Sequence, residues 1–224
     1  MTTHTETRAD AWRRRASLTG DVDFTMMYVA HDAFNRDLQR LVDATESGAA
    51  LSPPATATWR LFSKQLHTHH GAEDAALWPR LRAAVTDPQE VQVLDDMEAE
   101  HASLDPRLER IDFAIAAGDR TTLGIELGAL ARGVSAHMIH EEEAALPLLE
   151  RRTGSEGWES FTREIRAQQG GLKGAAEYLP WVLDGASAET TAKVLSLLPA
   201  PARLLYRGSW EKKYRRAERL GQQR

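Results

Sequence analysis

Apolar side chains recur at alternating spacings of three and four residues along four long stretches of the chain. This spacing places them on one face of an α-helix. The first stretch covers residues 21–46, and the second runs from about 54 to 84. The third runs through Leu94 and stops at Gly118, and the fourth covers about 121–153. Four amphipathic helices with short connections predict an all-α protein built as an antiparallel, up-and-down four-helix bundle.

Histidine and glutamate interrupt each of these apolar stripes. The interrupting residues are His31, His69, Glu73, His101, His137 and Glu141. Because they share a helix face with apolar residues, they are predicted to point into the core. The four histidines also lie about 15 or 16 residues from the nearest predicted turn between their helices. At a rise of ~1.5 Å per residue, equal distances on antiparallel neighbours bring these side chains level.

A short pattern occurs twice in the chain. His69, Glu73 and Pro79 are spaced by four and six residues, and so are the corresponding residues that begin at His137. The preceding histidines, His31 and His101, lie 38 and 36 residues before the second histidine of each half. This internal duplication predicts a pseudo-twofold arrangement, which suits a centre with two metal ions.

The repeated H-x-x-x-E spacing is typical of metal ligands on a helix. It places an imidazole and a carboxylate one turn apart on one face, so both can reach the same ion or neighbouring ions. The chain has no cysteine, so its ligands are nitrogen and oxygen, a set that suits iron or manganese and also admits zinc. The two glutamates are expected to bridge the ions. His31 is expected to pair with His101, and His69 with His137.

The alternative is that the six residues are core polar groups that pair only with one another. Buried polar groups that are poorly satisfied cost about 1–3 kcal/mol each. Six of them together would be comparable with a typical total stability of ~5–15 kcal/mol. Metal binding is therefore the favoured interpretation.

Other polar residues lie close to the candidate ligands along the helices: Tyr28, Asn35, His70, Asp105 and His140. Asn35 and Asp105 each follow a candidate histidine by four residues, so both are expected to point inward. Each of the five is interpreted as a partly buried polar group, and a role in supporting the ligands is the alternative. His67 is expected to be exposed, and His4 to lie in a tail.

Composition and charge exclude several classes of protein. The chain of 224 residues has 42% hydrophobic and 27% charged residues, which is ordinary for a globular protein. It has no run of about 18 apolar residues, so no membrane span is predicted. No apolar stretch follows Arg13, Arg14 and Arg15, so we expect no export and a cytoplasmic location. A formal charge of −5 does not favour nucleic acid as a partner.

The remaining third of the chain changes pattern. We expect residues 1–20 to form a tail, residues 21–152 the bundle, and residues 153–224 a helical extension packed on it, with breaks at Gly170-Gly171 and Asp184-Gly185. From residue 203 onward there are eight lysines and arginines against two glutamates. A solvated surface is the default interpretation, and docking to an acidic partner, nucleic acid or a membrane surface is the alternative.

The ordered pattern H…HxxxE…H…HxxxE resembles the hemerythrin-like (HHE cation-binding) family, in particular its bacterial members. The residues that carry the resemblance are His31, His69-His70-Gly71-Ala72-Glu73, Glu100-His101 and the stretch from His137 to Glu142. Leu77-Trp78-Pro79 and Leu146-Pro147-Leu148 look like the family's usual continuation. The resemblance covers about residues 21–152.

This resemblance implies a non-haem di-iron centre with an oxo or hydroxo bridge, for which manganese or zinc can substitute, and a small oxidant as its partner: dioxygen, peroxide or nitric oxide. Oxygen carriers of the family have a fifth histidine where this chain has Asp105, and an aspartate five residues after the histidine of the fourth helix. Reversible oxygen transport is therefore not expected. Two functions stay open: a di-iron oxidoreductase, for example one that decomposes peroxide, and a non-enzymatic redox or oxygen sensor or iron-binding regulatory module.

Overall fold

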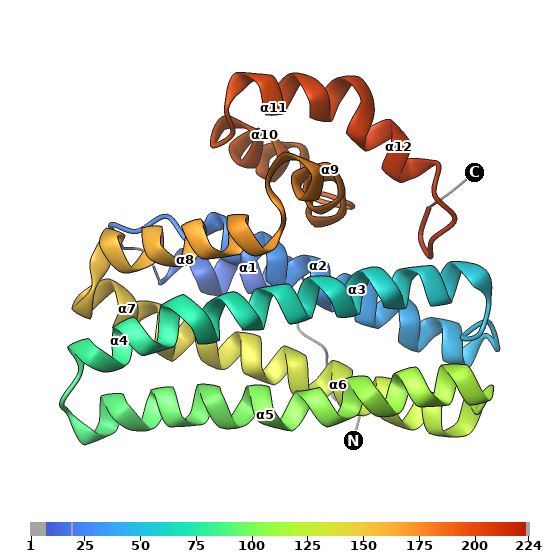
Figure 1. Cartoon of the computed structure of the whole chain (residues 1–224), viewed down its shortest axis with the longest axis horizontal. Helices are drawn as coiled ribbons and strands as arrows, with labels where there is room; N and C mark the ends of the chain where they lie inside the picture. The colour runs from blue at the N-terminus through green and yellow to red at the C-terminus, as the bar shows by residue number, and fades with distance from the viewer. Residues whose placement is uncertain (1–7, 19, 223–224) are drawn as a thin grey trace.

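The computed structural model describes residues 8–18 and 20–222, and four long helical rods dominate it (Figure 1). The rods lie alongside one another and alternate in direction, so the predicted up-and-down bundle is confirmed. The first two rods are α2 (Thr25–Glu46) and α3 (Pro53–Ala72) continued by α4 (Trp78–Ala84). The other two are α5 (Pro88–Ala117) and α6 (Arg120–His140) continued by α7 (Leu146–Arg152).

The ends of the rods follow from the local sequence. Ser52, Asp87 and Asp119 precede the second, third and fourth rods, and each side chain accepts a hydrogen bond from a backbone N–H in the first turn. Gly118 ends α5 with a φ of 70°, a conformation that suits glycine because it has no Cβ. These caps keep the connections short, so consecutive rods become antiparallel neighbours.

Two rods contain a π-helical turn at equivalent positions, η1 (Glu73–Leu77) and η2 (Glu141–Ala145). In each, the residue after the turn donates its N–H to the carbonyl of the glutamate, five residues earlier. Pro79 and Pro147 follow directly. A proline lacks an N–H and its ring crowds the carbonyl four residues before it, and a wider turn relieves both problems. The repeated His-Glu-Pro spacing therefore corresponds to a repeated backbone feature that begins at the two candidate glutamates.

The apolar core falls into two clusters along the bundle. One contains Trp59, Phe62 and Leu66, and the other contains Leu77, Trp78 and Leu81. The candidate ligands lie between these clusters along each rod, so they form a polar layer within an apolar interior. None of the described helices combines the length and the apolar character that crossing a bilayer requires.

The N-terminal stretch that we expected to be a tail contains a helix, α1 (Arg8–Ala16). Charged and apolar groups both contribute to its docking: the Arg15 side chain is buried and pairs with Asp32 and Glu142, and Trp12 packs against both apolar clusters. His4 lies outside the described residues.

After the bundle, a set of shorter helices covers one side of the molecule (Figure 1). They are α8 (Gly154–Gln168), α9 (Gly171–Val182), α10 (Ala188–Ser196), α11 (Ala200–Leu205), the π-helical turn η3 (Tyr206–Trp210) and α12 (Glu211–Arg215). Trp181 ties this layer to the bundle, because it is fully buried and its Nε1–H donates to Asp37 at 2.8 Å. The breaks predicted at Gly170-Gly171 and Asp184-Gly185 are both present. The division into three parts stays a prediction.

Candidate metal centre

The six residues predicted as ligands all lie in the polar layer, and none is more than 5% exposed. Together with His70 they form two groups in which one donor atom of each residue lies within 4.8 Å of the others. The first group is His31, His69 and Glu141, and the second is His70, Glu73, His101 and His137. Side chains from all four rods therefore meet at one level of the bundle.

The pairing of the histidines differs from the prediction. His31 lies beside His69, with ring centroids 5.4 Å apart, and not in a group with His101. The Nε2 atoms of His101 and His137 are 3.1 Å apart. Each pair comes from consecutive rods. Distances along the helices predicted that the four histidines would be level, but not which of them would face each other across the bundle.

His70 belongs to the second group, although the sequence argument interpreted it as a partly buried polar group and not as a candidate ligand. Its ring stacks on that of His101, with centroids 3.9 Å apart, and the residue is 6% exposed. The signal in the sequence is its spacing of three residues from Glu73, which puts the two side chains on one helix face. The corresponding position in the second half of the chain is Met138. The two groups are therefore unequal, because only one of them receives an imidazole from this position.

Three of the imidazoles are held through Nδ1 by a carboxylate. The pairs are His31 with Glu142 at 2.8 Å, His101 with Asp74 at 2.9 Å, and His137 with Glu100 at 2.7 Å. An Nδ1–H that donates to a carboxylate leaves Nε2 with its lone pair directed inward, which is the usual arrangement of metal-binding histidines. The duplication extends to these supports, since Asp74 and Glu142 each directly follow a candidate glutamate.

Several donor atoms of the two groups lack a hydrogen-bond partner among the described residues. They are Nε2 of His31 and of His70, both ring nitrogens of His69, and both carboxylate oxygens of Glu73 and of Glu141. A buried polar atom left in this state costs about 1–3 kcal/mol. A bound cation would satisfy these atoms together, so the residues present fit a metal ion.

Glu73 belongs to the second group and also approaches the first. One of its carboxylate oxygens is 3.1 Å from Nε2 of His69 in the first group, and the other is 3.5 Å from Nε2 of His101 in the second. Neither approach has the geometry of a hydrogen bond at the carboxylate. The Glu73 carboxylate therefore approaches histidines of both groups.

The electrostatics of the layer also favour a cation. Burial raises the pKa of Glu73 well above its usual value, and the nearby Glu141 raises it further. Burial lowers the pKa of His69 and of His70, so these imidazoles are neutral, as metal ligands must be. Burial also lowers the pKa of His31, but Glu141 and Glu142 outweigh this effect and raise the pKa to about 9. Buried carboxylates that raise a histidine pKa in this way also attract a metal cation.

The other polar residues near the ligands have mixed positions. Asp105 is exposed, so the prediction that it points inward was wrong: Leu104 and Leu108 occupy the inward face of α5 there. Asn35 is half-buried, with Nδ2 at 4.0 Å from the sulfur of Met138, and His140 is half-buried and bonded to Glu100. Tyr28 is buried, and His67 is exposed as predicted.

The carboxylate that supports His31 is itself held by α1. Glu142 accepts hydrogen bonds from Nε and Nη2 of Arg15 at 3.0 and 2.7 Å, and Asp32 accepts one from Nη1 at 2.8 Å. Burial would raise the pKa of Glu142, but His31 and Arg15 lower it to about 2. A chain of contacts thus runs from the N-terminal helix to a candidate ligand. The sequence argument did not predict this network.

Comparison with known protein families gives one result that bears on this centre. The family model described as the hemerythrin HHE cation-binding domain matches residues 22–175. No curated protein and no solved structure matches the chain. The matched range contains all seven residues of the two groups, and it extends beyond residue 152 through α8 and into α9. Membership of a bacterial subgroup stays a prediction.

Proposed function

The chain belongs to the hemerythrin family of HHE cation-binding domains, and from this premise we propose that its centre holds two non-haem iron ions and reacts with a small oxidant, namely dioxygen, peroxide or nitric oxide. One observation carries the proposal. Buried imidazole and carboxylate atoms from four rods converge in two adjacent groups, and most of them have no partner among the described residues.

The composition of the two groups supports iron. All of their donor atoms are imidazole nitrogens or carboxylate oxygens, a set that suits iron and manganese and also accepts zinc. Bound iron would supply redox chemistry toward small oxidants. The protein would hold the imidazoles in one orientation through Glu142, Asp74 and Glu100. The apolar clusters on both sides would exclude bulk water from the centre.

The direct test is metal analysis of anaerobically purified protein, combined with optical spectra before and after dioxygen, peroxide and nitric oxide. We expect iron in excess of other metals and a spectral change with at least one of the three oxidants. Peroxide turnover faster than that of free iron ions would support an enzyme. Protein that carries no metal after growth with iron and cannot be loaded afterwards would contradict the proposal.

Replacing His70 with methionine should weaken metal binding at one of the two groups. The substitution gives position 70 the same side chain as the corresponding position in the second half of the chain, Met138. Loss of one imidazole is expected to reduce affinity at this group by at least about tenfold, while the other group keeps its metal. Metal titrations of the apoprotein measure both affinities. His67→Met is the matched control, because His67 lies one turn earlier on α3 and is exposed, and it should leave both unchanged.

A sensor is the second candidate function, and the Arg15–Glu142–His31 chain of contacts favours it. Through this chain, the charge state of a bound metal would affect the docking of α1. Amide hydrogen exchange should then show faster exchange in α1 in one of the apo, oxidised and reduced states than in the others, whereas exchange in α5 stays constant. Identical exchange of α1 in all three states would contradict the sensor hypothesis.

A further inference from the structure

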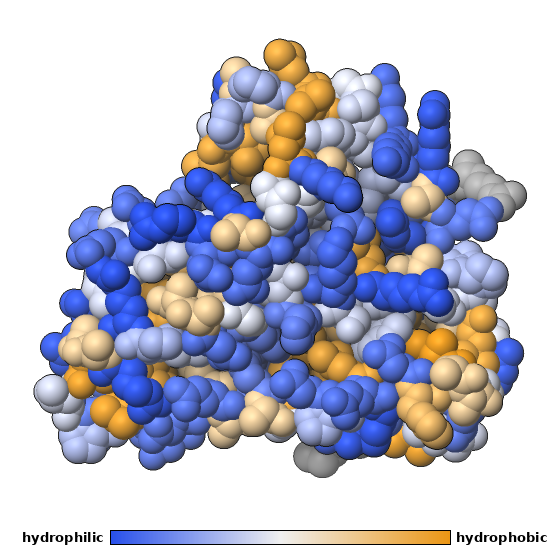
Figure 2. Space-filling view, viewed as in Figure 1, coloured by the Kyte–Doolittle hydropathy of each residue, from blue (hydrophilic) through white to orange (hydrophobic). Residues whose placement is uncertain are grey.

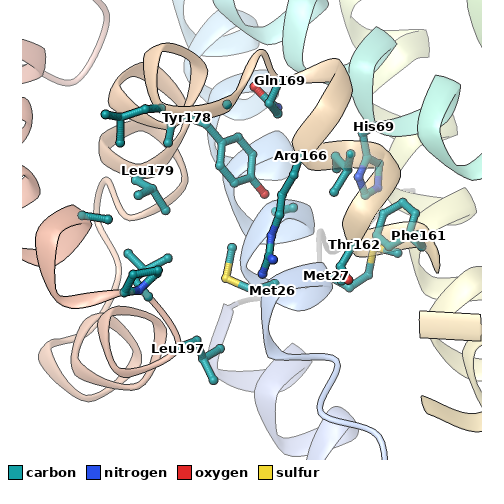
Figure 3. Close-up of a pocket in the computed structure, with 18 of the residues that line it drawn as sticks. Met26, Met27, His69, Phe161, Thr162, Arg166, Gln169, Tyr178, Leu179 and Leu197 are labelled. Carbon is teal, nitrogen blue, oxygen red and sulfur yellow. The ribbon is translucent and has the colours of Figure 1, made fainter. Parts of the chain in front are cut away.

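A cavity of about 460 Å³ lies between the bundle and the C-terminal helices (Figure 3). Its inner wall comes from α2, and the rest comes from α8, α9 and the segment from Leu197 to Ala202. Its volume is in the range of small-molecule binding sites. Much of the outer wall follows residue 175, outside the part of the chain that matches the family, so this cavity is not a feature of the family domain alone.

The walls of the cavity are mainly apolar. Met26 and Met27 line it from α2, and Phe161 and Ile165 line it from α8. Two other lining residues, Leu172 and Leu197, are 62% and 48% exposed. Hydrophobic residues also gather on the surface of the C-terminal layer in Figure 2. Large exposed apolar side chains are typical of interaction sites, which include ligand-binding grooves.

Arg166 and Tyr178 add polar groups to this apolar cavity. Figure 3 shows both side chains directed into it. Arg166 is the only charged residue among the described lining residues, and its guanidinium makes no ion pair within the described part of the chain. Burial raises the pKa of the Tyr178 hydroxyl, so this group stays protonated and can donate a hydrogen bond. No carboxylate of the described residues lines the cavity beside the Arg166 guanidinium and the Tyr178 hydroxyl. The two groups therefore favour a ligand with an anionic group.

The cavity also reaches His69, which is both a lining residue and a candidate metal ligand. The ring of Phe161 packs against that of His69, with centroids 6.2 Å apart. A molecule in the cavity would therefore extend from Arg166 toward the edge of the polar layer.

We propose that this cavity binds a medium-chain monocarboxylate. The carboxylate is held by Arg166 and Tyr178, and the alkyl chain lies against Met26, Met27 and Phe161. This binding does not depend on a metal ion, so the proposal can be tested separately from the function proposed above.

Isothermal titration calorimetry with decanoate tests the proposal, on the protein as purified and after metal removal. One decanoate should bind per chain in both preparations, and decanol, which lacks the charge, should bind more weakly. Arg166→Gln should weaken decanoate binding about fivefold, as expected for a partly exposed charge pair, and leave decanol binding unchanged. Arg163→Gln is the matched control, because Arg163 is exposed on the same helix and does not line the cavity.

Two substitutions that fill the cavity from different walls complete the test. Ala202→Trp and Ala175→Phe should each abolish decanoate binding, and circular dichroism shows which of them is folded. The proposal would be overturned if titration with decanoate gave no heat of binding. It would also be overturned if a folded variant with a filled cavity bound decanoate as tightly as the wild type. Binding to anionic lipid vesicles without any binding of decanoate would also overturn it, and would indicate instead that the exposed leucines and basic residues dock on a membrane surface.

Discussion

Replacing Glu73 with leucine should abolish metal binding at the centre and at the same time stabilise the metal-free protein. Glu73 is fully buried, its carboxylate oxygens have no hydrogen-bond partner among the described residues, and burial raises its pKa. An apolar side chain removes this desolvation cost, so the free energy of unfolding of the apoprotein should rise by about 1–3 kcal/mol. With metal present the wild type should be more stable than the variant, because only the wild type gains stability from the bound ion. Thermal unfolding with and without iron measures both effects.

This opposite effect on stability with and without metal distinguishes a metal ligand from a glutamate with only a structural role. If Glu73 served only to satisfy neighbouring polar groups, leucine would destabilise the protein whether or not metal was added. Glu109→Leu is the control, because Glu109 is exposed on α5 away from the two groups. It should change stability by no more than about 0.5 kcal/mol in either condition. Destabilisation of the apoprotein by Glu73→Leu would contradict the metal-ligand assignment.

Replacing Arg15 with methionine should cause the largest loss of stability. The Arg15 side chain is 3% exposed, and its substitution leaves Glu142 and Asp32 buried without this partner. Breaking a buried ion pair from one side costs about 3–5 kcal/mol. For a chain of this length, that loss lowers the melting temperature by roughly 10 °C. Differential scanning calorimetry measures the change.

Arg13→Met is the control for this prediction, because Arg13 lies on the same helix, is exposed and pairs with Asp10. Its melting temperature should remain close to that of the wild type. A double-mutant cycle then tests the specific contact. Arg15→Met combined with Glu142→Gln should cost less than the sum of the two single substitutions, because both remove the same pair. Additive losses would show that Arg15 and Glu142 do not stabilise each other, and would contradict the proposed contact.

The fold and most of the candidate centre were predictable from local pattern. The alternation of apolar and polar residues located all four rods, and Gly118 located the end of the third. The six candidate ligands were identified because a polar residue on an apolar stripe is expected to face the interior, an argument that failed for Asp105. Both of these signals depend only on helical periodicity, which links residues three or four positions apart.

The remaining features depend on contacts between residues far apart in the chain. Spacing along a helix indicates how high a side chain lies in the bundle, but packing decides which neighbour it faces, so His31 pairs with His69 and His101 with His137. The docking of α1 requires Arg15 to meet carboxylates from two other helices. The cavity forms because segments after residue 175 supply its outer wall, opposite the walls from α2 and α8. Such contacts are decided by the shape and charge of the assembled helices, and no periodicity within one helix encodes them.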